Sequence, residues 1–330
     1  MRILIVGGAG MLGRRLSAFL AGEGSLGGEP ISHLSLVDVV QPEQDFRADF
    51  GVTTVVADLA EDGVARDLVS GRPDVIFHLA AVVSGEAEAD LEKGYRVNLD
   101  GTRFLLDGVR RVTPDYCPRV VYASSIAVFG EPLPEVISDD QRLAPLTSYG
   151  TQKAIGELLL SDYTRRGLLD GVGIRLPTIC VRPGKPNQAA SGFFSSIIRE
   201  PLNGQEAVLP VPDDTRHWHA SPRAAVRFLV QAATIDGDAL GDGRCLTMPG
   251  VSVTVAEQIA ALRRVAGDEV ACRIRREPDQ SVMRIVAGWP RNFDARRAGA
   301  LGFKAEADFE EIIRVHIEDE HGGRISAVGV

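Results

Sequence analysis

The 330-residue sequence predicts an α/β fold: a doubly wound parallel sheet of the Rossmann type, followed by a smaller, mostly helical lobe. Three observations support this prediction. Short, wholly apolar stretches recur up to residue 181, and each is followed by a segment with helical spacing, which is typical of parallel strands covered on both faces. A glycine-rich turn joins the first strand to its helix. After residue 181 the alternation stops.

The predicted strands are short and rich in β-branched residues. They cover residues 2–6, 33–40, 52–59, 73–81, 119–125 and 173–181. Apolar residues at helical spacing predict a helix after the first strand, a helical stretch over about 86–111, and a helix that begins near Ser148 and is closed by Gly167. Two further helices are expected, at VAEQIAALRRVAG and DFEEIIRVHIED.

These elements predict two units. We expect a dinucleotide-binding domain over residues 1–181, completed by a segment at about 214–250. A substrate-binding lobe should be built from residues 182–213 and 251–330, and it begins with a proline-rich, loop-like region.

Composition narrows the possible partners. A net charge of −9 argues against nucleic acid and anionic membranes as main partners. The four cysteines show no C-x-x-C spacing, no apolar run approaches the ~20 residues of a membrane span, and the chain opens directly on a strand without a signal-peptide pattern. We therefore expect a soluble cytoplasmic protein. His217 and His219 offer too few ligands for a metal site, so no metal is expected.

Gly7, Gly10 and Gly13 form a G-x-x-G-x-x-G turn after the first strand. Such a turn needs one glycine for the tight bend, one for close approach of a pyrophosphate, and one for packing of the helix against the strand. The amides at the helix N-terminus then face the phosphates. The pattern indicates a dinucleotide site.

Asp38 ends the second strand, where a carboxylate accepts hydrogen bonds from the ribose hydroxyls of NAD and repels the 2′-phosphate of NADP. No arginine follows within three residues, so NAD is the expected cofactor. Asp58 and Leu59, which end the third strand, are placed to meet the adenine, although Asp58 is equally suited to cap the next helix.

Tyr149 and Lys153 are one helical turn apart, in the stretch SYGTQK. A phenol has an ordinary pKa near 10 and is a poor base at neutral pH, but an adjacent ammonium and an oxidised nicotinamide both favour the phenolate. Such a pair can remove a hydroxyl proton while hydride leaves the same carbon. Behind a dinucleotide turn, this interpretation outweighs a packed tyrosine beside a solvated lysine.

The sequence resembles the extended short-chain dehydrogenase/reductase superfamily over nearly its whole length. The resemblance is carried in order by GGAGMLG, HLAA (78–81), VNLDGT (97–102), SSIAVFG (124–130) and SYGTQK. It implies that Tyr149 is the acid/base, that Lys153 holds the nicotinamide ribose, and that Ser125 is the catalytic serine. Asn98 would position a water in the proton relay or bridge two backbone segments. The implied cofactor contacts also include Met11, Leu12, Leu79, Ala80, Ala81 and Pro177.

Most members of the superfamily act on nucleotide-linked sugars, and two features of this chain depart from them. Thr178 occupies the slot where those enzymes commonly have an asparagine that helps to hold the diphosphate, and Phe129 replaces the usual tyrosine. A finer resemblance, in stretches such as PLTSYGTQKAI and RLPTICVRPGKPN, is to members that oxidise the C2 hydroxyl of a free four-carbon sugar acid with NAD.

A sugar acid requires a group that binds carboxylate, and the planar fork of arginine suits this task. Arg216 occupies the position of a phosphate-binding arginine in sugar-nucleotide relatives, and we expect it to be reused for the carboxylate. The other candidate substrate contacts are Ser84, Ser125, Tyr149 and Thr178. Arg182, Lys185 and Asn187 are weaker candidates, because a loop rich in proline and glycine also exposes charges that have no function.

Three alternatives stay open at the level of sequence. The chain could be an NAD-dependent nucleotide-sugar epimerase or dehydratase, a catalytically idle NAD-binding protein, or a dehydrogenase for a different aldonate. An idle relative would be expected to lose Tyr149 or Lys153, and both are present. A homodimer is expected only by resemblance to the superfamily.

Overall fold

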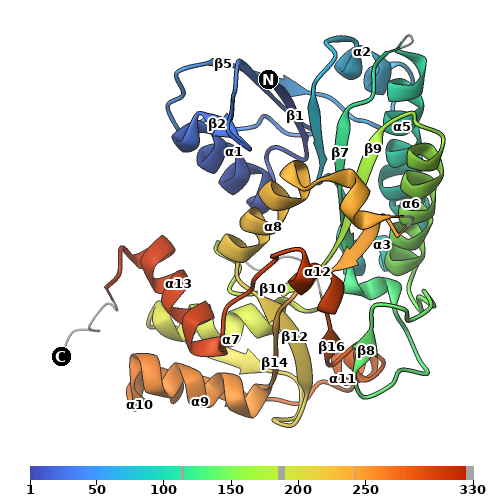
Figure 1. Cartoon of the computed structure of the whole chain (residues 1–330). Coiled ribbons are helices and arrows are strands. Elements are labelled where there is room, and N and C mark those ends of the chain that lie inside the picture. Colours follow the sequence, from blue (N-terminus) through green and yellow to red (C-terminus); the bar gives the residue numbers. More distant parts are fainter. Residues whose placement is uncertain (113–114, 185–189, 242, 325–330) are drawn as a thin grey trace.

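A parallel sheet of seven strands forms the upper half of the molecule, and the second lobe lies below it (Figure 1). The computed structural model describes residues 1–112, 115–184, 190–241 and 243–324. The strand order is β13-β9-β7-β6-β1-β4-β5. Because the order reverses beside β1, the crevice at the carboxyl ends of the strands opens next to the glycine turn. The predicted fold class is confirmed.

The strands of this sheet are β1 (Arg2–Val6), β4 (His33–Asp38), β5 (Gly51–Val56), β6 (Val75–His78), β7 (Arg119–Ser125), β9 (Asp170–Leu176) and β13 (Cys245–Thr247). The flanking helices are α1 (Met11–Glu23), α2 (Val64–Ser70), α3 (Ser84–Ala89), α4 (Leu91–Gly94), α5 (Gly101–Arg111), α6 (Ser148–Arg165) and α8 (Pro222–Thr234). Short elements in this half are β2 (Ser25–Leu26), β3 (Glu29–Pro30), the 3₁₀ turns η2 (Ile126–Val128) and η3 (Gly237–Leu240), and the π-helical η1 (Tyr95–Asp100).

Strand β1 shows why a wholly apolar run in the sequence predicted a strand of a parallel sheet. Ile3 and Ile5 are buried in one cluster with residues of α1 and α8, whereas Leu4 and Val6 are buried in another with residues of α2, α5 and α6. Both faces of the strand are therefore apolar, as expected for a parallel sheet covered on both sides.

Four predicted strands end earlier than expected, and one predicted helix is divided. Strands β4, β5 and β6 end at Asp38, Val56 and His78, so Asp58 and Leu59 follow the third strand instead of ending it. The sixth strand was predicted to run to residue 181, but β9 ends at Leu176. Pro177 has no N–H to donate to the ladder, and beyond it Thr178 and Ile179 pair with a different sheet. The single helical stretch over 86–111 is instead α3, α4, η1 and α5 in succession. The seventh strand, β13, has only three residues and was not predicted.

The second lobe is mostly helical, as expected, and it also contains small sheets. Its strands are β8 (Ile137–Ser138), β10 (Thr178–Ile179), β11 (Ala207–Leu209), β12 (Arg216–Ala220), β14 (Val251–Thr254), β15 (Ile274–Arg276) and β16 (Phe293–Asp294). Its helices are α7 (Gly192–Leu202), α9 (Val255–Ala266), α10 (Asp268–Ala271), α11 (Gln280–Ala287), α12 (Arg296–Ala300) and α13 (Phe309–His321). Residues of α7, α9 and α13 bury a separate apolar cluster.

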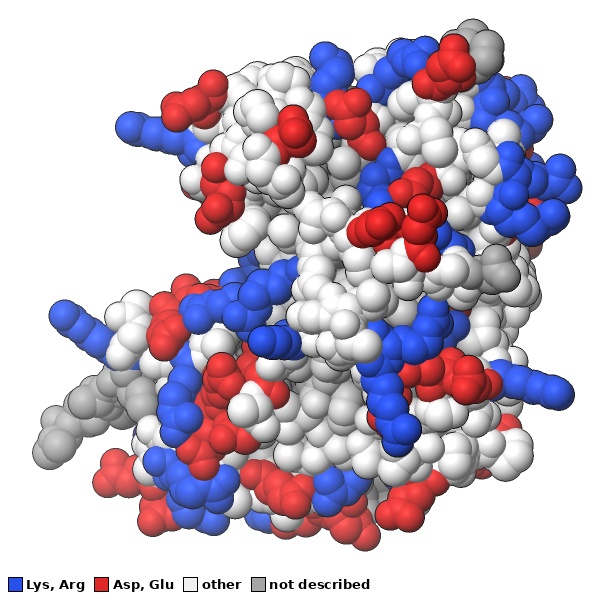
Figure 2. All heavy atoms as spheres, in the orientation of Figure 1, with Lys and Arg blue, Asp and Glu red and all other residues white. Residues whose placement is uncertain are grey.

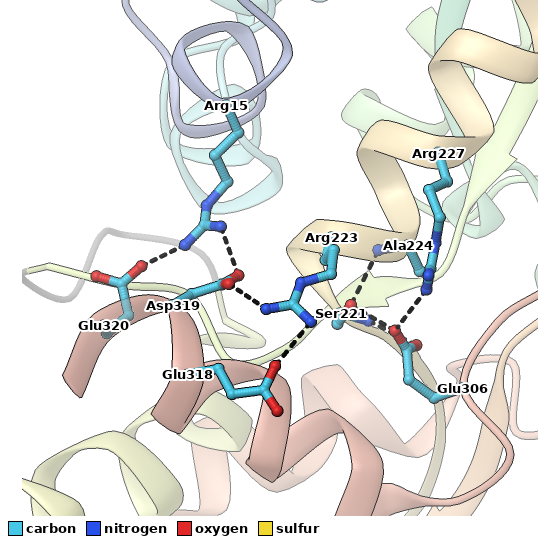
Figure 3. A network of polar contacts seen from close by, with 9 residues as sticks. All are labelled: Arg15, Ser221, Arg223, Ala224, Arg227, Glu306, Glu318, Asp319 and Glu320. Carbon is cyan, nitrogen blue, oxygen red and sulfur yellow. Dashed lines mark hydrogen bonds and ion pairs between the residues drawn. The ribbon is translucent and has the colours of Figure 1, made fainter. Parts of the chain in front are cut away.

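Ion pairs attach helix α13 to the upper domain (Figure 3). Arg15 on α1 pairs with Asp319 (2.8 Å) and Glu320, and Arg223 on α8 pairs with Glu318 (2.9 Å) and Asp319. Three acidic residues in the last turns of a helix oppose its dipole. The two arginines neutralise them and so link the last described helix to α1 and α8.

Acidic and basic side chains are interspersed over much of the face drawn in Figure 2. No helix within residues 1–112, 115–184, 190–241 and 243–324 is long and apolar enough to cross a membrane.

Buried histidines predict a loss of stability in acid. Burial lowers the pKa of His78 to about 3 and that of His217 to about 4. Because both values lie below the unfolded pKa of roughly 6.5, their contribution to stability is complete above that pH and declines as the pH falls toward the folded values. The free energy of unfolding should fall by about 1.4 kcal/mol per pH unit for each of them below roughly pH 6. Urea titrations at pH 7.5 and 5 measure this, and equal unfolding free energies would contradict it.

Candidate active site

The glycine turn closes tightly on the loop after β6. Gly7 has φ +94°, and a Cβ added to it would lie 2.6 Å from the amide nitrogen of Ala80. A Cβ on Gly13 would lie 2.2 Å from the Gly7 carbonyl oxygen. Helix α1 then begins at Met11, with Gly10 as an N-cap that supplies no side-chain bond. The amides of its first turn are therefore left for an anionic ligand.

Asp38 lies at the carboxyl end of β4, beside this turn. Its Oδ2 accepts from the Ala9 amide (3.0 Å) and its Oδ1 from the Val39 amide (2.8 Å). The carboxylate is thus held in a fixed orientation and stays partly exposed. This geometry fits recognition of ribose hydroxyls.

Replacing this carboxylate should change cofactor choice. In Asp38→Asn the charge that repels a 2′-phosphate is removed, and one acceptor for the ribose hydroxyls becomes a donor. We expect KM for NAD to rise about tenfold, and the preference for NAD over NADP to narrow by at least as much. Steady-state kinetics with both cofactors measure this change. An unaltered NAD/NADP ratio would mean that the ribose is recognised elsewhere.

Asp58 and Leu59 were expected to meet the adenine. Asp58 accepts from Arg96 Nη1 (2.6 Å) and from the Ala60 amide (2.9 Å). Burial raises the pKa of Asp58, but the hydrogen bond and charge of Arg96 outweigh it and lower the pKa below its ordinary value. The side chain of Leu59 is buried, and a Cβ added to Gly101 would lie 3.7 Å from it. Only the backbone of Leu59 is then available to a base, and the adenine contact stays a prediction.

Ser125 and Tyr149 are brought together by close packing of α6 on η2. A Cβ on Gly150 would lie 2.2 Å from the Ala127 carbonyl oxygen, so only glycine allows this approach. Thr147 caps α6 by accepting from the Gly150 amide (3.1 Å). Ser125 ends β7 and accepts from the Ala127 amide (3.1 Å), and its hydroxyl lowers the pKa of Tyr149. The packing therefore places the predicted serine and tyrosine on neighbouring elements.

Lys153 is buried behind Tyr149. Its Nζ donates to the Ala123 carbonyl oxygen (2.8 Å) and lies 5.8 Å from the centre of the Tyr149 ring. Burial lowers the pKa of Lys153 to about 8, while Glu157, one turn further along α6, raises it. Glu157 in turn pairs with Arg175 (2.8 Å). Of this buried pair, which could not be found from the sequence, the Glu157 carboxylate is the member that favours the charged form of Lys153.

The pKa of Tyr149 is raised above its ordinary value, because burial disfavours the phenolate. The hydrogen bond from Ser125 and the charge of Arg182 oppose this rise. Arg182 is thus a cation that favours the phenolate, and the same effect of Lys153 and of an oxidised nicotinamide stays a prediction.

The side chain of Asn98 makes three hydrogen bonds that connect the loop after β6 to helix α6. Its side chain accepts from the Val82 amide (2.9 Å), donates to the Val82 carbonyl (3.2 Å) and donates to Gln152 Oε1 (2.8 Å). Val82 lies two residues before Ser84, the first residue of α3. Asn98 therefore ties the segment before Ser84 to α6, and its part in a proton relay stays a prediction.

The substrate candidates fall into two groups. Pro177 and Thr178 follow β9, whose last residue, Leu176, is in register with Ser125. Arg182 is partly buried and donates to the Ile179 carbonyl (3.1 Å). Asn187 and Lys185 lie outside the described residues.

Arg216 contacts a different set of residues. It donates to the Ser252 carbonyl (3.0 Å) and pairs with Glu257 (3.2 Å). It lines a cavity of about 1140 Å³ together with Glu131, Asp214 and Trp289, among others. Arg182 is the arginine whose charge lowers the pKa of Tyr149, whereas Arg216 lines the cavity. The role of Arg216 as the carboxylate-binding group stays a prediction.

Among the described ranges no group of three or more His, Cys, Asp or Glu side chains is arranged to hold a metal ion.

The fold, the glycine turn and the Ser125–Tyr149–Lys153 group define a dinucleotide-binding protein with the residues of a short-chain dehydrogenase. The chain belongs to the NAD dependent epimerase/dehydratase family, whose family model matches residues 3–220.

The known proteins that are similar to this chain have been described as two different kinds of enzyme. The chain is 51% identical to a D-erythronate dehydrogenase of Cupriavidus necator, over 97% of this chain and 98% of that protein. It is 42% identical to a D-erythronate dehydrogenase of Haemophilus influenzae, over 96% and 99%. It is also similar to a crystal structure described as a nucleoside-diphosphate-sugar epimerase from Agrobacterium tumefaciens, with 61% identity, a TM-score of 0.96, and coverage of 98% and 96%.

Proposed function

We propose that the chain oxidises the C2 hydroxyl of D-erythronate to 2-oxo-D-erythronate with NAD as the acceptor. The two relatives named D-erythronate dehydrogenase, each aligned over almost the whole chain, support this substrate. The structural support is Arg182, whose guanidinium is held just after β10 by the Ile179 carbonyl (3.1 Å) and Ser191 Oγ (3.1 Å) and whose charge lowers the pKa of Tyr149. A small acid bound by its carboxylate to this arginine would place its C2 hydroxyl at the tyrosine.

The residues around the glycine turn fit NAD. The amides at the start of α1 would bind the pyrophosphate and Asp38 the adenosine ribose. Leu79, Ala80, Ala81 and Pro177 would line the path to the nicotinamide. When bound, NAD accepts the hydride from C2 and its positive ring favours the tyrosine phenolate.

Tyr149 would take the proton of the C2 hydroxyl at its Oη. Ser125, whose hydroxyl favours the phenolate, would hold the phenol in place by a hydrogen bond. Lys153 supplies a buried positive charge behind the ring and would hold the nicotinamide ribose. Proton removal by a positioned base typically contributes about 10²–10⁴-fold to such a reaction.

The proposed chemistry is tested by following the hydrogen on C2. D-Erythronate deuterated at C2 is incubated with the protein and NAD, and both products are examined by NMR and mass spectrometry. We expect deuterium on C4 of the reduced nicotinamide and a 2-oxo acid that is trapped by a hydrazine. A product that keeps the deuterium at C2 would overturn the oxidation.

A nucleotide-sugar epimerase is the second candidate. The cavity of about 1140 Å³ beside Arg216 is larger than a four-carbon acid requires, and the similar Agrobacterium structure is described as an epimerase of this kind. Thr178 in place of the usual asparagine argues against it. A coupled assay with UDP-sugars distinguishes the two functions.

We also propose that the chain forms a homodimer and acts in the cytoplasm. Leu158 on α6 is 65% exposed, and α6 packs beside α5 on one outer face of the sheet. A second copy packed across these helices would bury this leucine. Light scattering of the eluted protein gives the mass, and a monomer at micromolar concentration would contradict the dimer.

A further inference from the structure

A hydrogen-bonded pair, Thr178 and His217, connects the end of β9 to the second lobe. Thr178 Oγ1 lies 2.7 Å from His217 Nε2, and His217 Nδ1 lies 2.9 Å from the Pro290 carbonyl oxygen. The histidine is 3% exposed and its ring is stacked on Phe194, with 5.2 Å between the centres. The ring therefore has a fixed place and two fixed partners.

These partners determine where each proton lies. A carbonyl oxygen only accepts, so His217 Nδ1 must carry the proton of this bond. Burial lowers the pKa of His217 to about 4, so at neutral pH the ring has one proton and Nε2 has a lone pair. The Thr178 hydroxyl must then donate to Nε2. Its only proton is used, and its oxygen is left solely as an acceptor.

The pair lies beside the proposed reaction centre. Leu176, two residues before Thr178, is in register with Ser125 on the neighbouring strand. The Arg182 amide donates to Ser195 Oγ (3.0 Å), next to Phe194, on which the His217 ring is stacked. The charge of Arg182 lowers the pKa of both His217 and Tyr149. Thr178 itself is partly exposed.

We propose that Thr178 accepts a hydrogen bond from a substrate hydroxyl beyond C2, and that His217 is the positioning residue that fixes this polarity. The inference rests on the proposed oxidation of a four-carbon sugar acid. Groups that only accept, such as a carboxylate or a phosphate, gain nothing from Thr178. The substrate is therefore oriented with its carboxylate toward Arg182 and a hydroxyl toward Thr178. A diphosphate, which needs donors, is disfavoured at the same place.

Deoxy substrates combined with variants test this hydrogen bond. The wild type, Thr178→Val and Thr178→Ser are assayed with NAD and D-erythronate, 2,4-dihydroxybutanoate, which lacks the C3 hydroxyl, and 2,3-dihydroxybutanoate, which lacks the C4 hydroxyl. We expect the wild type to lose about tenfold in kcat/KM on one deoxy acid. Thr178→Val should show the same tenfold lower kcat/KM on D-erythronate. On that deoxy acid its kcat/KM should equal that of the wild type. Thr178→Ser should keep the discrimination.

His217→Phe and His217→Gln test the positioning role. Phenylalanine removes the acceptor, so the freed hydroxyl should discriminate less between D-erythronate and the deoxy acid, while KM for NAD is unchanged. Glutamine retains an acceptor and should restore part of the discrimination. The thermal midpoint and NAD affinity of every variant show that it is folded.

The outcomes separate this inference from the function beneath it. A wild type inactive on every four-carbon acid overturns the proposed function and this inference together. If the wild type is active and Thr178→Val discriminates between D-erythronate and the deoxy acids as strongly as the wild type does, only this inference is overturned. If both histidine variants discriminate like the wild type, His217 has no positioning role.

Discussion

Tyr149→Phe is expected to lower kcat for oxidation of D-erythronate by at least 10³-fold while NAD affinity changes less than about threefold. The phenylalanine ring keeps the packing of α6 but has no oxygen to take the C2 hydroxyl proton. Ser125 and Lys153 keep their places, since Lys153 is held by the Ala123 carbonyl. Steady-state kinetics and isothermal titration with NAD measure the two effects.

Tyr163→Phe is the matched control for this substitution. Tyr163 is on the same helix and donates to Asp107 Oδ1 (2.8 Å), and its interactions lie on the side of α5. Its loss should leave kcat unchanged and cost only a modest amount of stability. Retained turnover in Tyr149→Phe, with the control also active, would mean that another group is the base.

Arg182→Met is expected to raise KM for D-erythronate about 100-fold with little change in KM for NAD. A hydrogen-bonded charge pair between arginine and a carboxylate contributes roughly 1.5–3 kcal/mol. Methionine retains much of the side-chain length and apolar packing while removing the charge. Arg182→Lys keeps the charge but loses the fork, so an intermediate value is expected.

Arg216→Met is the control, because Arg216 contacts Ser252 and Glu257 and is not among the groups that shift the pKa of Tyr149. We expect its KM for D-erythronate to stay within about threefold of the wild type. The reverse pattern, a large effect at 216 and a small one at 182, would return the carboxylate site to the position that the sequence suggested. Thermal midpoints guard against misfolding, since Arg182 also donates to the Ile179 carbonyl.

The local motifs were the part of the site that could be predicted from sequence. Gly7, Asp38 and the Tyr149–Lys153 pair each lie within a short stretch whose strand or helix sets their geometry. The succession of the central-sheet strands along the chain, from β1 to β9, could be predicted because their apolar runs are buried on both faces. Pro177 was a visible reason to end β9 at Leu176, because it lacks an N–H, but the apolar run obscured it.

Tertiary contacts determined the rest. Arg182 and Arg216 are equivalent by residue type, and only the fold places one of them near Tyr149. Thr178 and His217 are 39 residues apart and meet because β10 and β12 are paired in a small sheet. The Glu157–Arg175 pair joins α6 to β9 in the same way. No periodicity in the chain specifies such pairings.

The most direct test is absorbance at 340 nm with the purified protein, NAD and a panel of four-carbon aldonates, with UDP-glucose and UDP-galactose in parallel coupled assays. We expect NADH to form with D-erythronate, faster than with its stereoisomers, and no conversion of either UDP-sugar. Conversion of a UDP-sugar together with no NADH from any aldonate would contradict the proposed dehydrogenase and establish the nucleotide-sugar epimerase instead.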